Sequence, residues 1–537
     1  MSTARGWRRE GLALAAVVLA ALVLRLAYRI DHDEDIDALR FALGVERFDV
    51  VAQRPHAPYY PVFIAAAKLL AALGASARGA LAIVSAAAGA ATVAFTALLA
   101  AEVELSRSPS TSPSTSTAGA RRAGALAAAL ALASPALWLA AEKLLSDMAG
   151  VAVFTAALWL CARGRRLAAA GEAARAGRAR TIALVLLGVG LGVRLSYFPI
   201  ALACLAVIAR DEARAGRGAL AAWAARTGDL AVGTLAWLVP LLILTPAQQL
   251  LASTWIQAVG HFTRWGGSAV TVSSPTARLY GAAWGLWANA LGGAWADAPP
   301  LRWIGTPLLA LLLLALLAPL AAAAHARRHQ NSKNPWSALP ELWASAIAYA
   351  AWALLGQNTV YKTRHWLPLV PLLIVAIVAG ARALGHALPP RARALAPAAA
   401  ILLAAQWLAD GLALARDHLA PSPAAALVAH LRDDAGPPRP IFTRDLGRMI
   451  EEGAPAWRPR RAAHDDALVR AIVEAGPDGA LITTEALSPR ARAALAARGY
   501  TLTVRFARPR SRYVDPLWID LALVEARPAT PLPAPAD

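Results

Sequence analysis

Long apolar stretches separated by short basic ones dominate the chain. Runs such as residues 11–30, 81–101 and 304–324 consist mostly of alanine, leucine, valine and similar residues. A helix needs roughly 20 apolar residues to cross a hydrocarbon core of about 30 Å. These runs therefore predict membrane-spanning helices, and the whole pattern predicts an α-helical polytopic membrane protein rather than a soluble one.

Taken in order, the apolar stretches predict about eleven spans. The predicted spans lie near 11–30, 77–102, 122–140, 147–162, 181–194, 199–209, 229–246, 304–324, 337–356, 366–386 and 395–415. The stretch 181–209 is divided because Pro199 lacks a backbone donor and disfavours helix in the residue before it. The first run is longer than a signal-peptide core, so we expect it to stay as an uncleaved span.

The basic residues predict an orientation. Only 16% of residues are charged, 58% are hydrophobic, and the formal net charge is +19. Lysine and arginine favour short cytoplasmic loops. With the spans above, the basic segments all fall on one side, namely the N-terminus and the segments 103–121, 163–180, 210–226, 327–333 and 382–393. We therefore expect a cytoplasmic N-terminus and a multi-pass plasma-membrane protein, and no nucleic-acid partner.

The pattern changes at about residue 420. Helix-like stretches at 424–432 and 489–498 alternate with apolar stretches at 440–443, 480–484, 502–506 and 518–524. This alternation predicts a small α/β domain. The expected organisation is a transmembrane domain over 1–419, with a first outer loop at about 31–76, and an extracytoplasmic α/β domain over 420–537 with a disordered tail.

The segment after the first span is strongly acidic. It reads Asp31-His-Asp-Glu-Asp-Ile-Asp37 and contains five carboxylates in seven residues. Close like charges repel, so other groups must compensate these carboxylates or use them. The segment is either a solvated acidic cap at the membrane interface, or it supplies a carboxylate base or ligands for a divalent cation.

Two motifs in this loop carry a family resemblance. Asp35-Ile-Asp37-Ala-Leu-Arg-Phe41, followed by Arg54-Pro-His56-Ala-Pro-Tyr59-Tyr-Pro61, resembles the first extracytoplasmic loop of the C-type (GT-C) glycosyltransferases. The resemblance is to bacterial relatives of the protein O-mannosyltransferases and of the aminoarabinose transferase that acts on lipid A. It implies a bacterial inner-membrane enzyme with a polyprenyl-phosphate sugar donor and a catalytic aspartate in this loop. Asp37 fits that role first and Asp35 second, although Ala38 replaces the family's usual acidic neighbour.

Other predicted outer loops are similar to the same family. They are Ser134–Asp147, Gly192–Pro199, Gly260–Gly267 and Tyr361–Pro368. The resemblance implies that the donor phosphate is bound by Arg194, Lys362, Arg364 and Lys143. It implies substrate contacts from His56, Tyr59, Glu142, Asp147, Tyr197, His261, Arg264, Trp265 and His365.

These residue types suit the implied reaction. Cleaving a sugar from polyprenyl phosphate leaves a dianionic phosphate, which cationic side chains stabilise. An attacking hydroxyl or amine must lose a proton to a base such as Asp37, and a single displacement inverts the anomeric carbon. Each residue also has a structural interpretation: Arg194 or Arg364 as headgroup contacts, the histidines as packing residues, and the tryptophans of 247–303 as an interfacial belt or a sugar-stacking surface.

No cofactor is required by these motifs. A divalent cation at Asp33, Asp35 and Asp37 stays open, but the resemblance gives no reason to require one, and the two cysteines, Cys161 and Cys204, lie in apolar segments. The expected partners are a polyprenyl-phosphate-linked sugar, membrane lipids, and an acceptor that is a glycan, a lipid or a protein. The alternative functions are a multi-span secondary transporter, whose polar residues should gather near the bilayer midplane, and a noncatalytic scaffold for the C-terminal domain.

Overall fold

The computed structural model describes residues 2–107, 113–265, 267–272, 274–315, 339–360, 362–462, 464–476, 478–514 and 517–529. The chain divides into two units. The first contains Met1–Ile30 and Phe41–Ala415, and the second contains Asp31–Arg40 and Arg416–Asp537. The acidic segment after the first span therefore belongs to the unit that contains the C-terminal domain.

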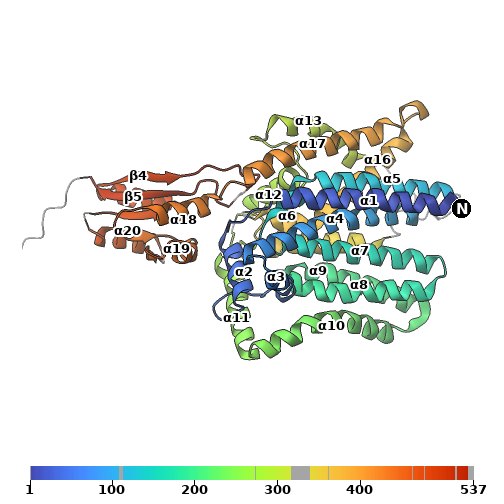
Figure 1. Cartoon of the computed structure of the whole chain (residues 1–537), viewed down its shortest axis with the longest axis horizontal. Helices are drawn as coiled ribbons and strands as arrows, with labels where there is room; N and C mark the ends of the chain where they lie inside the picture. The colour runs from blue at the N-terminus through green and yellow to red at the C-terminus, as the bar shows by residue number, and fades with distance from the viewer. Residues whose placement is uncertain are drawn as a thin grey trace, which may run out of the picture. The chain divides into compact units, whose positions relative to one another are not determined.

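The first unit is a bundle of helices (Figure 1). Its α-helices are α1 (Ser2–Ala27), α3 (Pro61–Ala72), α4 (Ala77–Arg107), α5 (Pro113–Ala133), α6 (Pro135–Glu142), α7 (Asp147–Ala169), α8 (Ala173–Val193), α9 (Phe198–Glu212), α10 (Ala219–Leu244), α11 (Ala247–Gly260), α12 (Pro275–Ala283), α13 (Pro300–Leu314), α15 (Pro340–Gly356), α16 (Val370–Ala387) and α17 (Leu395–His418). Short 3-10 or π segments are η1 (Leu195–Tyr197), η2 (Ala213–Arg217), η3 (His261–Trp265), η4 (Trp284–Ala290), η5 (Thr363–Leu369) and η6 (Pro390–Ala392). Helix α2 (Ile36–Glu46) begins in the second unit and ends in the first.

Within the described residues, six helices are long and apolar enough to cross a membrane, and a seventh span results if the pair α5–α6, bent by 56°, counts as one. The chain is thus a polytopic membrane protein, but the predicted number of eleven spans is not confirmed. Helices α9 and α13 each have only 15 residues. The predicted span 304–324 ends beyond residue 315, outside the described part of the chain.

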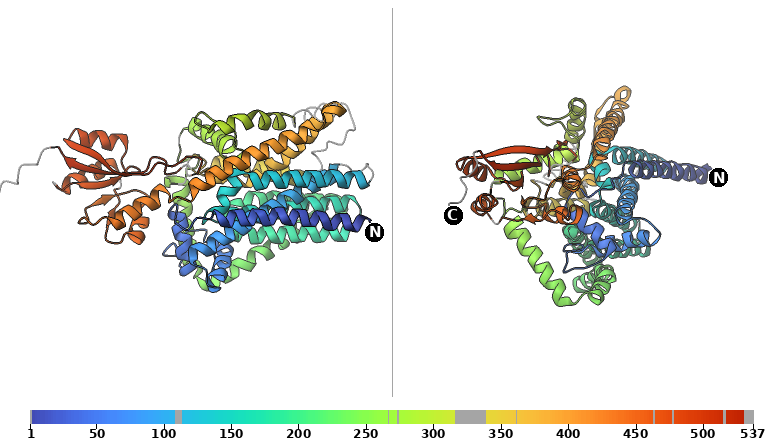
Figure 2. Two further views of the ribbon diagram at one scale, coloured as in Figure 1. Left: turned by 45° about the horizontal axis from the view of Figure 1, so that its top comes forward. Right: turned by 60° about the vertical axis from the view of Figure 1, so that its left-hand side comes forward.

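The break predicted near Pro199 is present. Helix α8 ends at Val193, and α9 begins at Phe198 with the proline in its first turn, where the missing backbone donor costs nothing. As a result, α7, α8, α9 and α10 run alternately up and down the bundle, and α8 packs against both α7 and α10. Figures 1 and 2 show α7 and α8 side by side, with α10 at the edge of the bundle.

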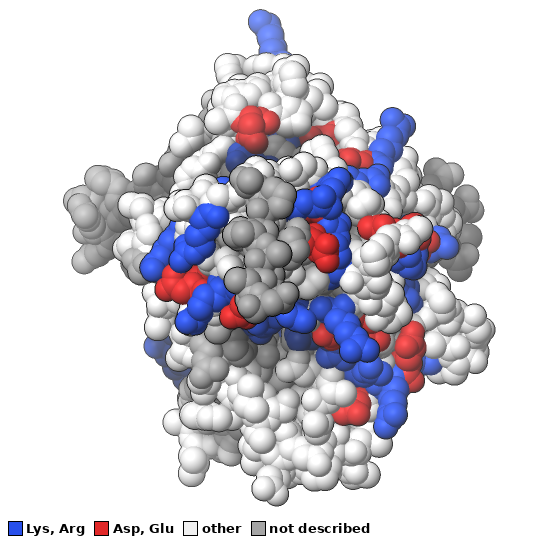
Figure 3. All heavy atoms as spheres, turned by 90° about the vertical axis from the view of Figure 1, so that its left-hand side faces the viewer, with Lys and Arg blue, Asp and Glu red and all other residues white. Residues whose placement is uncertain are grey.

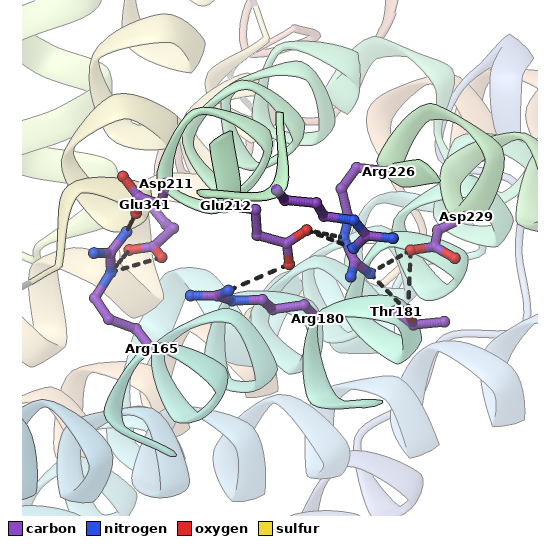
Figure 4. A network of polar contacts seen from close by, with 9 residues as sticks. Arg165, Arg180, Thr181, Asp211, Glu212, Arg226, Asp229 and Glu341 are labelled. Atoms are coloured by element: carbon purple, nitrogen blue, oxygen red, sulfur yellow. Dashed lines mark hydrogen bonds and ion pairs between the residues drawn. The ribbon is translucent and has the colours of Figure 1, made fainter. Parts of the chain in front are cut away.

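The two ends of this bundle differ in chemistry. At one end, here called the basic end, α7 and α9 finish and α8, α10 and α15 begin. A network of buried ion pairs joins them (Figure 4): Arg226 pairs with Glu212 at 2.9 Å, and Arg165 pairs with Glu341 at 2.8 Å. Arg165, Arg180 and Arg226 come from the segments predicted to be cytoplasmic. Since each arginine binds a carboxylate of another helix, the network ties the helix ends together.

At the opposite end, here called the site end, α8 and α15 finish and α7 begins. Helices α3 and α11 gather at this end, away from the N-terminus (Figures 1 and 2). The turn before α3 is anchored there by a small apolar cluster of Val50, Ala57, Tyr59, Leu241 and Leu250. The site end therefore brings together the segments that carry the family-like motifs of the first unit.

The second unit contains a small α/β domain. Its sheet has the strand order β2-β1-β3-β5-β4, in which β1 is parallel to β2 and β3, whereas β5 is antiparallel to β3 and β4. The strands are β1 (Ile441–Phe442), β2 (Pro459–Arg460), β3 (Ala480–Thr483), β4 (Tyr500–Ala507) and β5 (Ala522–Pro528). The helices are α18 (Pro423–Asp433), α19 (Gly447–Gly453), α20 (Asp465–Glu474) and α21 (Pro489–Ala496). The predicted α/β character of this region is confirmed.

Apolar side chains of the sheet and of α20 and α21 form the core of this domain. Ile441 pairs with Leu481, and Ile482 pairs with Val524 across the antiparallel neighbour. Phe442, Ile472 and Leu495 are buried in the same cluster. Ser422 and Ser488 cap α18 and α21 through their hydroxyl oxygens, which accept backbone N–H groups at 3.1 and 3.0 Å.

Charged side chains on one face of the molecule are mixed in sign. Figure 3 shows acidic and basic side chains interspersed there, with uncharged surface between them. The net charge of +19 is thus not concentrated into one continuous basic surface on this face. Continuous basic surfaces are what nucleic-acid phosphates require.

Candidate active site

Arg194 is the central residue of the site end. It follows the last residue of α8, where the backbone turns into η1, and only 5% of it is exposed. Its guanidinium forms an ion pair of 2.8 Å with Asp147, the first residue of α7, and donates a hydrogen bond of 3.1 Å to the Ser146 hydroxyl. A buried arginine next to one carboxylate costs less than an isolated charge. Two residues predicted from separate motifs are therefore in direct contact.

The turn before α3 packs against Arg194. The Arg194 guanidinium lies 5.8 Å from the ring centre of Tyr60 and 5.9 Å from that of Tyr197. Tyr60 also contacts the edge of Phe41, at 4.8 Å between ring centres, and its hydroxyl lies 3.3 Å from Nε2 of His56. The predicted substrate residues His56 and Tyr197 thus belong to the surroundings of Arg194.

The same turn has an unusual backbone. Tyr59 and Tyr60 both have positive φ, at 68° and 48°, which is uncommon for residues with a side chain. The Tyr59 hydroxyl donates to the Leu250 carbonyl at 2.9 Å and lies 3.0 Å from the Thr254 hydroxyl. The contacts of both tyrosines hold the strained turn, and such strain is typical of functional sites.

A second basic segment lies near Arg194. The positive charges of Lys362, Arg364 and Arg194 all lie within electrostatic range of His365. Arg364 also lies within electrostatic range of Arg194. We call Arg194, Lys362 and Arg364 the basic cluster. Tyr349 links its two parts, because its hydroxyl donates to the His365 carbonyl at 2.8 Å and its ring packs edge-on against Tyr197.

His261 comes from a third segment. One ring nitrogen, Nε2, lies 2.7 Å from the carbonyl oxygen of Gly356, at the end of α15. Burial lowers the pKa of His261, the hydrogen bond to Gly356 opposes this, and the charge of Lys362 lowers the pKa further. His261 therefore lies within electrostatic range of Lys362 in the basic cluster. The side chains of the predicted residues Arg264 and Trp265 lie outside the described part of the structure.

The predicted catalytic carboxylates belong to the second unit. Oδ1 of Asp35 accepts the backbone N–H of Ala38 at 2.9 Å, so Asp35 caps the first turn of α2. Asp37 is half-buried in that first turn. Burial lowers the pKa of Arg40, and the charges of Asp37 and Asp35 oppose this effect. Asp35 thus caps α2, and the catalytic roles predicted for Asp37 and Asp35 stay predictions.

Two further predicted residues lie at the end of α6. Glu142 is completely buried, and its charge acts on Arg25, a buried arginine of α1 that lies over Trp138. Lys143, the next residue, is half-buried at the helix end. The predicted substrate role of Glu142 and phosphate role of Lys143 stay predictions.

Several site-end residues did not stand out in the sequence. Tyr60 lies beside Arg194, and Tyr349 contacts Tyr197 and the His365 carbonyl. The guanidinium of buried Arg278 donates to the carbonyls of Gly267, Leu354 and Gln357. The positive φ of Tyr60 has no sequence signal, because tyrosine rarely adopts it. The sequence around Arg278 does not distinguish it from an arginine that lies at the membrane interface. Among the described residues, no group of three or more histidine, cysteine or acidic side chains could hold a metal ion.

Solved structures share this architecture, although no protein-family model matches the sequence and no curated protein matches it. ArnT from Cupriavidus metallidurans bound to undecaprenyl phosphate aligns with 97% of this chain and 98% of its own, with 16% identity and a TM-score of 0.50. The oligosaccharyltransferase AglB from Archaeoglobus fulgidus, in complex with an inhibitory peptide and a dolichol-phosphate, aligns with 91% of this chain and 72% of its own, with 12% identity and a TM-score of 0.45. Both are glycosyltransferases of the GT-C fold. The likeness to ArnT establishes that fold for this chain.

Proposed function

We propose that this chain is a membrane glycosyltransferase that moves a sugar from a polyprenyl-phosphate donor to an acceptor on the extracytoplasmic face of a bacterial inner membrane. The observation that carries the proposal is that Tyr197 and Tyr349 connect Arg194 to the segment 362–365, which supplies Lys362 and Arg364, at one end of a GT-C bundle. Undecaprenyl phosphate is bound in the ArnT structure of the same fold. An anionic phosphate at a membrane surface is the ligand that such cations suit.

The proposed reaction is a single displacement. The acceptor hydroxyl or amine attacks the anomeric carbon, the bond from that carbon to the phosphate oxygen breaks, and its electron pair stays on the phosphate. The Asp37 carboxylate takes the acceptor's proton, and the basic cluster stabilises the phosphate dianion. Attack opposite the leaving group inverts the anomeric centre. No metal or other cofactor is needed for this balance.

The family resemblance supports Asp37 as the first candidate for the base. Asp37 lies in the first turn of α2. Asp35, the second candidate, already accepts the Ala38 amide as the helix cap. The acceptor is a glycan, a lipid or a protein.

The test is sugar transfer by the full chain in nanodiscs, with a panel of polyprenyl-phosphate sugars. Asp37→Asn should lower kcat by at least about a hundredfold, as expected for loss of a general base. Arg364→Gln should weaken donor binding as well as catalysis, because it removes a phosphate contact. The matched control is Asp31→Asn, since Asp31 is exposed in the same acidic segment.

Three results would contradict the proposal. Full transfer by a folded Asp37→Asn variant would exclude Asp37 as the base. If no donor binds and proteoliposomes instead carry a solute or ion flux, the chain is a transporter. If neither donor binding nor flux is found, the noncatalytic scaffold is the remaining function.

A further inference from the structure

The acidic segment that precedes α2 is held by residues of the C-terminal region, far away in sequence. Glu34 is buried, and its carboxylate oxygen Oε1 lies 2.8 Å from Nε2 of His418 and 3.5 Å from Nη1 of Arg510. Arg510 also donates from Nη2 to the His418 carbonyl at 2.9 Å. All three residues belong to the second unit. One carboxylate therefore binds two groups that lie 384 and 476 residues away.

Ser422 holds the backbone of the same segment. Its hydroxyl donates to the Glu34 carbonyl at 3.2 Å, and its backbone N–H donates to Nε2 of His32 at 3.3 Å. The same hydroxyl oxygen accepts the Ala425 N–H and caps α18. The position of Glu34 is thus coupled to the start of a helix in the C-terminal domain.

These contacts end where α2 begins. Glu34 is followed directly by Asp35, whose carboxylate caps α2, and the carbonyl of Asp35 accepts the N–H of Leu39 at 3.2 Å. Asp37 lies in this first turn. A helix start is fixed when its cap is fixed, because the cap satisfies the free N–H groups of the first turn. Any group that immobilises Glu34 therefore also orients Asp37.

Charge compensation gives the contacts a physical reason. Five carboxylates lie within seven residues, and like charges at this spacing repel. The Arg510 side chain is only 3% exposed, so its attraction to Glu34 is weakly screened. The charges of Arg448 and Arg40 also act in this unit, beside Asp37 and Asp35. Residues of the C-terminal region therefore hold the acidic segment at Glu34 and compensate the charge of this carboxylate.

We propose that His418, Ser422 and Arg510 are positioning residues, through which the C-terminal domain fixes the orientation of Asp37 for sugar transfer. The catalytic part of this inference rests on the proposed function. The C-terminal domain would then take part in the reaction, whereas in a noncatalytic scaffold it would not. A misplacement of a reacting group by about 1 Å can cost roughly a hundredfold in rate.

The test compares Arg510→Ala with Arg490→Ala in the full chain. Arg490 is a matched control because its side chain is 76% exposed and pairs at 3.4 Å with the exposed Asp466 of the same domain. Arg510→Ala should lower kcat for transfer at least about tenfold, with KM for the donor within about threefold. Amide exchange in the peptide covering 31–40 should be faster in this variant. Arg490→Ala should change neither quantity.

Two conservative variants guard against misfolding. Glu34→Gln keeps the shape of the side chain and removes its charge, and Arg510→Lys keeps a cation; both should give smaller losses of kcat than Arg510→Ala. The inference is overturned if the amides of residues 31–40 exchange at the wild-type rate in both Arg510→Ala and Glu34→Gln, whether or not sugar transfer is found. It is also overturned if exchange rises while kcat stays unchanged. Absence of transfer in wild type refutes the proposed function instead, and is seen separately from the exchange result.

Discussion

His32 is a single residue whose charge state is coupled to the fold. Its side chain is mostly buried in the second unit, and its Nε2 accepts the backbone N–H of Ser422. Burial lowers the pKa of His32 to about 4, with the charges of Glu34 and Asp31 opposing the effect and those of His418 and Arg510 adding to it. The folded state therefore keeps His32 neutral at pH values where the unfolded chain protonates it.

This coupling predicts acid sensitivity. Because the folded pKa lies below the unfolded value of about 6.5, the stabilising effect is present above that value and is lost as the pH falls toward about 4. The full loss amounts to about 3 kcal/mol. Thermal unfolding in detergent between pH 7.5 and 4.5 should show a steep fall in stability for wild type and a shallower one for His32→Gln. Parallel curves for the two proteins would show that protonation of His32 does not contribute.

At the scale of elements, close helix contact depends on glycine at two facing positions. A Cβ added at Gly188 of α8 would lie against the carbonyl of Leu230 and 2.7 Å from the nitrogen of Thr234, both on α10. A Cβ added at Gly233 of α10 would meet the carbonyl of Val185 and lie 2.9 Å from the nitrogen of Val189. Small residues let two backbones approach closely, which is how helices gain packing energy in a membrane.

The glycine contact predicts different effects of the same substitution at two places on α10. Gly233→Ala should destabilise the bundle by about 1–3 kcal/mol, because the backbone atoms it meets cannot move aside without shifting a helix. Gly228→Ala, where an added Cβ has nothing within 4 Å, should be neutral or stabilise by about 0.5–1 kcal/mol. Thermal unfolding of both variants in nanodiscs measures the difference. Equal melting temperatures would contradict the assigned contact.

At the scale of the whole bundle, buried ion pairs connect helices that are distant in sequence. Arg302 of α13 and Asp410 of α17 pair at 2.7 Å, and only 1% and 3% of their side chains are exposed. At the basic end, Glu341 of α15 similarly binds Arg165 of α7. Removing one member of such a pair leaves the other charge buried, whereas removing both does not.

The pair of Arg302 and Asp410 can be tested by a double-mutant cycle. Asp410→Leu should destabilise the bundle by about 3–5 kcal/mol, because the Arg302 charge stays buried without this carboxylate. Combining Asp410→Leu with Arg302→Met should recover most of that loss. Unfolding of the single and double variants, measured in the same nanodiscs, gives the coupling energy. Additive losses would mean that the pair does not act as a unit.

The sequence by itself determined the features that depend on local pattern. Apolar runs predict the helices α4, α7, α8, α10 and α16, because the period of hydrophobic residues and the cost of burying charges in lipid act over short stretches. The break before Pro199 follows from one missing backbone donor, and the α/β character of the C-terminal region follows from alternating short apolar segments.

Only the tertiary structure decided which groups meet. The ion pair of Arg194 with Asp147 and that of Arg510 with Glu34 join residues that are far apart in the sequence. The left-handed backbone of Tyr59 and Tyr60 likewise depends on tertiary contacts. No local propensity encodes such contacts, since they form only when packing has fixed both partners. For the acidic segment the sequence left a solvated cap, a base and a metal site open. The fold shows that Asp35 caps a helix and that residues of the C-terminal region bind Glu34.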